Sequence, residues 1–317
     1  MKRFIVLVLG IFLILGAGIE ANAAEIYITS EEAKVTYPNI RFTGEMPRVS
    51  GLVDESFQDE VNARIAEVYY DFEQAAISAN AFRLDFDFEH MADGDSNFIL
   101  IYATIAAAHE LQQISVISFD SSEGRFLTVK DFLGPNAVSL AEQYIAAYMR
   151  QSPGLFNSEF AGLSPDYSFV VADGRVEFLF NQGEIAPARF GIVRVAINTE
   201  NVRSVSFAED EYLTVTDFMV KMIPLRQAAE ALGYIVEWNE YDRVIRVING
   251  GFEARIEVGQ NIYSLVGRVD PVELEAPPLL VDGVTHVPVS FFSEIMGASH
   301  SADEDRTVTI SIYVNSL

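Results

Sequence analysis

A row of alternating acidic residues is the first feature whose spacing could do chemistry. Asp85, Asp87 and Glu89 are separated by Phe86 and Phe88. In a β-strand, this period of two places the carboxylates on one face and the aromatic rings on the other. A glycosidase needs two carboxyl groups roughly 5–10 Å apart across a cleft, which this row could supply. A solvated strand face is commoner in an acidic protein, so we predict no catalytic residue and keep Asp85 and Asp87 as candidate ligand contacts.

Metal-binding patterns are incomplete in this sequence. Residues 93–97 resemble the first half of a calcium-binding loop, but Phe98 stands where a glycine is needed and Thr104 where a glutamate should close the site. We interpret them as a polar turn, with a weak surface calcium contact as the alternative. The histidines occur singly, outside any zinc-enzyme motif; they are His90, His109, His286 and His300. We therefore predict no metal site and no cofactor.

Trp238 is the single tryptophan of the chain and the candidate for ligand recognition. The face of an indole ring can stack on the apolar side of a sugar. The residue also belongs to the alternating segment 235–238, whose pattern favours a strand and a packing role. Both interpretations of Trp238 stay open at this point.

The charge balance excludes several classes of protein. Lys and Arg total 21 against 46 Asp and Glu, which gives a formal net charge of −25 over 317 residues. Such a chain lacks the excess of positive charge that attracts nucleic acid, and it should be repelled by anionic lipid. The absence of cysteine excludes disulfides, thiol catalysis and iron–sulfur clusters. Half of the residues are hydrophobic, so a folded core is expected.

The first residues have the pattern of a secretory signal peptide. A basic start, residues 1–3, precedes an apolar run over 4–18, and Ala21-Asn22-Ala23 offers a small-residue cleavage site. The run is shorter than the roughly 20 residues that span a bilayer, which disfavours the alternative of a retained anchor. We expect removal of residues 1–23, a secreted protein associated with the cell envelope, and no membrane insertion of the mature chain.

Residues 24–198 are expected to form one α+β domain. Apolar residues recur every three or four positions after Asp54, which predicts a helix capped by that carboxylate. A second helix is predicted over 136–150. Alternating segments predict strands over 82–89, 97–106, 113–120, 167–171 and 175–180. Helices packed on one side of an antiparallel sheet are the simplest arrangement of these elements.

Residues 212–317 contain an internal repeat. The segment 223–233 aligns with 287–297, so that Pro224 matches Pro288 and Gly233 matches Gly297. Proline suits the first turn of a helix, and glycine suits the left-handed position that ends it. We therefore predict a short helix in each copy.

A β-hairpin is expected after each of these helices. The turns should lie at Asp242-Arg243 in the first copy and at Asp305-Arg306 in the second. Two copies are too few for a solenoid, so we predict that they pack into one smaller α+β module. Residues 199–211, which include three consecutive acids, are expected to be an acidic linker.

The second unit resembles the copper amine oxidase N-terminal-like domain, also called a stalk domain. The likeness rests on Pro224-Leu225-Arg226, on 229–233, on 236–239 and on 242–244, together with the second repeat. In the oxidases this region is a non-catalytic appendage, so the resemblance implies a presentation or interaction module. A copper site would need clustered histidines, which this sequence does not contain.

The first unit is similar to the extracellular RsiV/PdaC-type domain. Residues 47–52, which include Gly51, match the opening of that domain, 124–132 match its middle strand, and 184–187, which end at Pro187, match its closing motif. This domain occurs in lysozyme-sensing anti-sigma factors and beside some peptidoglycan deacetylases. The resemblance implies an extracellular α+β domain.

Together these observations predict a secreted, non-catalytic binding or scaffolding protein of the cell envelope. Its expected partners are peptidoglycan or a basic wall-directed protein such as lysozyme. One alternative is a carboxylate-based hydrolase of wall glycan. Another is a lysozyme-type sensor or inhibitor, whose acidic surface would bind a basic enzyme in a salt-dependent manner.

Overall fold

The computed structural model describes residues 26–32, 39–151, 154–156, 160–164, 167–215, 219–241, 243–267 and 270–314. The expected signal peptide, residues 1–23, and Asp242 lie outside these ranges. Within them helices and mostly antiparallel strands are mixed, which confirms the α+β class. None of the described helices is long and apolar enough to cross a membrane.

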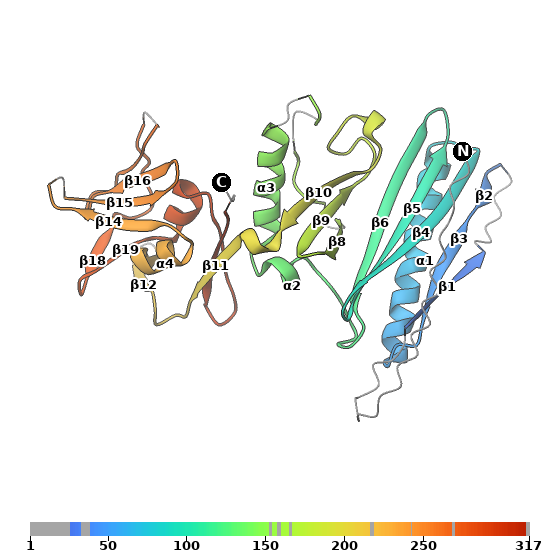
Figure 1. The fold of residues 1–317 in the computed structure, drawn as a ribbon, viewed down its shortest axis with the longest axis horizontal. Helices are drawn as coiled ribbons and strands as arrows, with labels where there is room; N and C mark the ends of the chain where they lie inside the picture. The colour runs from blue at the N-terminus through green and yellow to red at the C-terminus, as the bar shows by residue number, and fades with distance from the viewer. Residues whose placement is uncertain are drawn as a thin grey trace.

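A long sheet and one helix form the N-terminal part (Figure 1). The strand order is β2 (Arg41–Thr43), β4 (Arg83–Asp93), β5 (Ser96–Ala106), β6 (Glu110–Asp120) and β7 (Arg125–Phe126). Helix α1 (Glu55–Ser78) packs a stripe that includes Ile65 and Phe72 against Leu84 and Ile99 of the sheet. The antiparallel pair β1 (Tyr27–Glu32) and β3 (Glu45–Ser50) completes this part.

Helix α1 begins where the sequence predicts. One carboxylate oxygen of Asp54 accepts hydrogen bonds from two backbone N–H groups of the first turn, at 2.9 and 3.2 Å. Gly51, just before it, has a φ of 87°, which a side chain would disfavour. Farther along the helix, the Asn62 amide bonds both the N–H and the C=O of Val49, each at 2.9 Å. These polar contacts hold the segment 47–52 against the helix.

A second sheet follows in the middle of the chain (Figure 1). It consists of β8 (Ser168–Ala172), β9 (Arg175–Phe180) and β10 (Val193–Asn198), and it is accompanied by α2 (Lys130–Leu133), α3 (Ala137–Gln151) and the 3₁₀ turn η1 (Ala188–Phe190). Strand β5 is apolar on both faces, so Phe98 and Leu100 join the core of this second sheet while Ile99 faces α1. The two long helices are therefore divided between two sheets.

Two four-stranded sheets build most of the C-terminal part. The first has the order β12 (Leu213–Val215), β13 (Val220–Pro224), β19 (Val284–Pro288) and β18 (Leu279–Val281). The second runs from β14 (Ile235–Asn239) through β15 (Val244–Asn249) and β16 (Phe252–Ile256) to β17 (Tyr263–Leu265). Helix α4 (Leu225–Ala231) and the π-helix η3 (Phe291–Ile295) contribute to the core beneath them.

The structure confirms the internal repeat. Strands β13 and β19 pair antiparallel with Ile223 opposite Val287, which are equivalent positions of the two copies. Gly233 and Gly297 both have positive φ, 89° and 72°, at the end of their helices. Pro224 is the N-cap of α4 rather than a residue of its first turn.

The hairpin of the second copy turns at Arg306, which has a φ of 62°, between β20 (Ser299–Ala302) and β21 (Val308–Tyr313). In the first copy β14 and β15 form the predicted hairpin, and Arg243 has a φ of 53° at its turn. The two arginines thus occupy matching turn positions.

The prediction of an acidic linker is wrong for residues 202–207. They form strand β11 (Val202–Phe207), which pairs with β21 in the three-stranded sheet β11-β21-β20. The physical reason is an alternating pattern: Val205 and Phe207 face the core of the C-terminal part, while Ser204 and Ser206 bond Ser311 and Thr309 on the other face. Strand β11 takes the place beside β21 that β16 takes beside β15.

Candidate functional site

A groove beside Trp238 is the strongest candidate for a binding site. Strand β14 alternates as predicted: Val236 is buried, while Ile235 is 60% exposed on the opposite face. Trp238 shares the face of Val236 and lies opposite Ile245 of β15. Because it stands at the end of the strand, its ring remains 50% exposed over the groove. The indole is therefore partly packed and partly available to a ligand.

Three parts of the C-terminal fold form the walls of this groove. Its volume is about 460 Å³, and its lining joins the start of α4, the end of the sheet around Trp238, and the β18–β19 hairpin. Apolar side chains dominate, and several are unusually exposed: Val258 by 37%, Leu280 by 60% and Val284 by 44%. Exposed apolar side chains that gather in a hollow indicate an interaction site.

Arg226 is the charged residue among the described residues that line the groove. Its Nη1 donates to the carbonyl oxygen of Val236 at 2.6 Å and to Glu230 Oε1 at 2.9 Å. These bonds hold the guanidinium at the rim. No carboxylate belongs to the described lining, so the groove differs from the acidic surface of the rest of the chain.

The carboxylate row predicted from the sequence lies in another part of the molecule, on β4. Asp85, Asp87 and Glu89 share one face, as their spacing predicts. Asp85 forms an ion pair with Arg83 at 2.7 Å and accepts a hydrogen bond from the hydroxyl of Thr43. Its carboxylate is thus bound by side chains of β2 and β4, at one edge of the sheet.

Glu89 belongs to a polar cluster between the long N-terminal sheet and the second sheet. It accepts a hydrogen bond from the Tyr102 hydroxyl at 3.1 Å, and Arg194 of β10 donates to the same hydroxyl oxygen at 3.0 Å. Burial and the charge of Glu89 raise the pKa of Tyr102 to about 12. The row of acids does not line the Trp238 groove, and its described contacts tie strands together.

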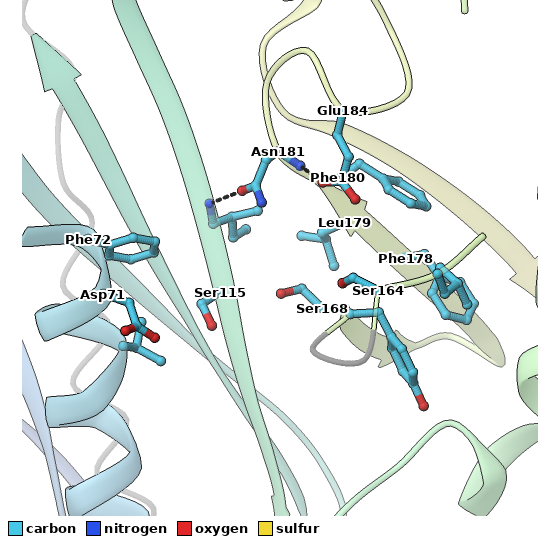
Figure 2. A pocket seen from close by; sticks show the side chains of 14 residues that line it. Asp71, Phe72, Ser115, Ser164, Ser168, Phe178, Leu179, Phe180, Asn181 and Glu184 are labelled. Atoms are coloured by element: carbon cyan, nitrogen blue, oxygen red, sulfur yellow. Dashed lines mark hydrogen bonds between the residues drawn. The ribbon is translucent and has the colours of Figure 1, made fainter. Parts of the chain in front are cut away.

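A smaller cavity that the sequence did not predict lies between α1, β6 and the end of β9. Figure 2 shows Asp71 on the helix side and Ser164, Ser168 and Asn181 around the opposite wall. Its volume is about 210 Å³. The Oδ1 atom of Asn181 accepts from the N–H of Ile114 at 2.8 Å. Such side-chain bonds join the edge of β6 to the second sheet, and only the folded chain brings these distant segments together.

The calcium-like loop is a tight turn. Residues 94 and 95 connect β4 to β5, with Asp93 paired to Ser96 across the hairpin. Gly94 has a φ of 60° there. In the part of the chain that the structure describes, no group of three or more histidines and carboxylates could hold a metal ion.

Pro187, the remaining motif residue, precedes η1 and has a φ of −52°. The turn that follows is held by Gln182, whose side-chain amide donates to the carbonyl of Ala188 at 2.9 Å. Gln182 also binds β6 through the N–H and C=O of Gln112. Gln182, just before the closing motif, therefore links the second sheet to β6.

Comparison with known proteins finds a similarity for the C-terminal unit. Residues 215–311 match the copper amine oxidase N-terminal domain family. The match contains the Trp238 groove and the helix of each copy of the repeat. It begins after β11, so the strand that completes the second copy lies before the matched residues.

A curated relative described as a protease inhibitor, from Brevibacillus choshinensis, is 28% identical over 116 residues. The aligned part covers 37% of this chain and 33% of that protein, about a third of its length.

Two solved structures of the DUF3298 family are similar to this chain. The one from Bacteroides fragilis has a TM-score of 0.38 and 14% identity, and it covers 56% of this chain and 91% of its own. The one from Pseudomonas aeruginosa has a TM-score of 0.39 and 13% identity, and it covers 56% of this chain and 92% of its own.

Proposed function

We propose that this chain is a secreted, non-catalytic binding protein of the cell envelope, and that the Trp238 groove holds a wall-associated glycan or polypeptide. The observation that carries the proposal is a half-exposed indole beside exposed Val258, Leu280 and Val284. A partner that covers these apolar side chains removes them from water, which favours binding. The copper amine oxidase N-terminal domain, a module without a catalytic site in the oxidases, supports the same role.

The expected export signal and the similarity of residues 24–198 to the RsiV/PdaC-type domain support a location at the envelope. The acidic charge supports a second contact with basic proteins, since opposite charges speed association at low salt. Under this proposal the N-terminal part adds electrostatic contact, and the C-terminal groove supplies the apolar one.

The test is retention of the mature chain, residues 24–317, on purified peptidoglycan and on immobilised lysozyme across a salt series. Trp238→Ala should weaken retention about tenfold or more, since a buried tryptophan anchor is commonly worth about 2 kcal/mol. The matched control is Ile235→Ala, which removes a similarly exposed apolar side chain from the opposite face of the same strand. Ligand binding should also shift the tryptophan fluorescence, because Trp238 is the single source of it.

Equal loss of retention in both variants, or retention of the wild-type chain on neither support, would contradict the proposal. Release of reducing ends from wall glycan would overturn the non-catalytic role. In that event Asp85→Ala and Asp87→Ala would test whether the carboxylate row is responsible.

A second candidate function is inhibition of a protease. It is favoured by the relative described as a protease inhibitor, with 28% identity over 116 residues. Titration of the mature chain against representative serine, cysteine and metalloproteases tests this candidate. Stoichiometric loss of activity of one class would support it, and unchanged activity of all classes would exclude these targets.

A further inference from the structure

The internal repeat produces a second groove in the C-terminal part. It lies beside the start of β13 and the strands β20 and β21, and its volume is about 670 Å³. Its lining includes three groups that carry or can accept charge: Lys221, Glu275 and His300. Ser301 and five apolar residues form the rest of the described walls: Met219, Val220, Val289, Ala302 and Val308.

This second groove occupies the same place in the second copy of the repeat as the Trp238 groove does in the first. Strands β13 and β19 cross at Ile223 and Val287, so an approximate twofold axis relates the copies there. Lining residues correspond pairwise under the repeat: Leu225 with Val289, Val236 with His300, Trp238 with Ala302, Ile245 with Val308, Val284 with Val220, and Thr285 with Lys221. Two hollows at equivalent positions are a property of the module.

The substitutions between the copies change the chemistry of the second groove. Ala302 stands in place of Trp238, which leaves the groove larger, about 670 against 460 Å³. Lys221 stands in place of the uncharged Thr285, and His300 stands in place of the apolar Val236. The apolar floor remains, with Val289 and Val308 in place of Leu225 and Ile245.

The charged groups of this groove have defined neighbours. The carboxylate of Glu275 accepts a hydrogen bond from the buried hydroxyl of Ser290. The Lys221 ammonium lies 5.6 Å from the centre of the Tyr212 ring. Burial lowers the pKa of the His300 imidazole; the Glu275 charge opposes that shift, and the Lys221 charge adds to it. The groove therefore offers the Lys221 ammonium, the His300 imidazole and the Glu275 carboxylate, which the Ser290 hydroxyl already engages.

We propose that this second groove binds short peptides that end in a small apolar residue with a free carboxylate. Lys221 and His300 would bind the carboxylate, and Val220, Val289 and Val308 would contact the small side chain. Charge complementarity favours this occupant. In a chain of net charge −25 an anionic ligand needs a local cation, and Lys221 provides one. Glu275, whose carboxylate accepts from the Ser290 hydroxyl, lies in the same lining and would accept a backbone N–H of the peptide. The inference rests on the proposed function, because the peptide parts of a cell wall offer this chemistry.

The experiment titrates the mature chain with N-acetyl-alanyl-alanine and, separately, with the C-terminal amide of the same peptide. The imidazole signals in NMR, assigned with His300→Asn, report occupancy. We expect saturable shifts of the His300 signals with the acid and at least tenfold weaker binding of the amide. Lys221→Met should weaken binding of the acid by about tenfold, whereas Lys130→Met, an exposed lysine on α2, should leave it unchanged.

Ala302→Trp provides a second, independent variant. It introduces the indole that the first copy carries, and it should weaken peptide binding at least tenfold by narrowing the groove. Equal binding of acid and amide, or unchanged binding in both Lys221→Met and Ala302→Trp, would overturn the inference. Wall retention that depends on Trp238 without peptide titration at His300 would remove this inference and leave the proposed function intact. Peptide titration at His300 without Trp238-dependent wall retention would remove the proposed function of the Trp238 groove and leave peptide binding by the second groove intact.

Discussion

The side-chain amide of Asn136 donates a hydrogen bond to the backbone carbonyl of Thr309, 2.9 Å away and 173 residues later in the chain. The same nitrogen also lies 3.2 Å from the carbonyl oxygen of Ser299 and 3.1 Å from the Ser311 hydroxyl. Asn136 is almost fully buried. A single amide at the start of α3 thus joins the middle sheet to the C-terminal part.

Replacement of this amide should uncouple the two parts of the chain. We expect Asn136→Ala to lower the free energy of unfolding by about 2 kcal/mol, because buried hydrogen-bond partners are left without their donor. Ser139→Ala, which removes one neighbouring bond to Ser299, should cost about 1 kcal/mol. Urea unfolding of the mature chain measures both. A change below about 0.5 kcal/mol in Asn136→Ala would show that the junction does not contribute to stability.

Strand β11 should be required for the C-terminal part to fold alone. A fragment of residues 199–317 should fold cooperatively, whereas 208–317 should not, because it lacks Phe207 of the core and exposes the edge of β21. Circular dichroism and thermal unfolding distinguish the two fragments. Equal melting temperatures would contradict a structural role for β11.

The two helix-ending glycines should respond alike to alanine. Gly233→Ala and Gly297→Ala should each cost about 1 kcal/mol, since both residues have positive φ. The new methyl group at Gly233 would meet the end of the Arg203 side chain, which can move aside, whereas Gly297 has open space. Gly251→Ala, at a position without that backbone constraint and without near neighbours, is the control and should change stability little. Thermal unfolding measures all three variants.

The acid stability of the second C-terminal sheet should depend on Glu253. Hydrogen bonds from the guanidinium groups of Arg246 and Arg255 hold the pKa of Glu253 at about 2. Because the folded pKa lies below the unfolded value of about 4.3, this carboxylate stabilises the fold above that value. The stabilisation disappears as the pH falls towards 2.

Glu253→Gln should therefore be less stable than the wild-type chain at pH 6. The difference should shrink as the pH falls from about 4.5 to about 2. Urea unfolding over a pH series measures it, with Glu304→Gln, an exposed acid in the turn between β20 and β21, as the control. A difference that does not change with pH would rule out this ion pair as its source.

Local patterns in the sequence predicted many elements and some of their ends. The spacing after Asp54 predicted α1 and its cap, because both depend on residues within one or two turns. The alternation of Asp85, Phe86 and Asp87 predicted which side chains face the core, since a strand has a period of two. The matching prolines and glycines of the repeat predicted two equivalent helix ends.

Tertiary structure alone decided which of these elements share a sheet and where hollows remain. Val205 and Phe207 precede an acidic stretch, and only pairing with β21 makes them part of the core. Trp238 has the pattern of a packed strand residue, yet its exposure depends on where β14 ends relative to the β18–β19 hairpin. Lys221 of β13 and His300 of β20 lie far apart in sequence and belong to different sheets, yet both line the second groove. Short-range periodicity determines the elements, whereas long-range pairing, which no local pattern encodes, determines the grooves between them.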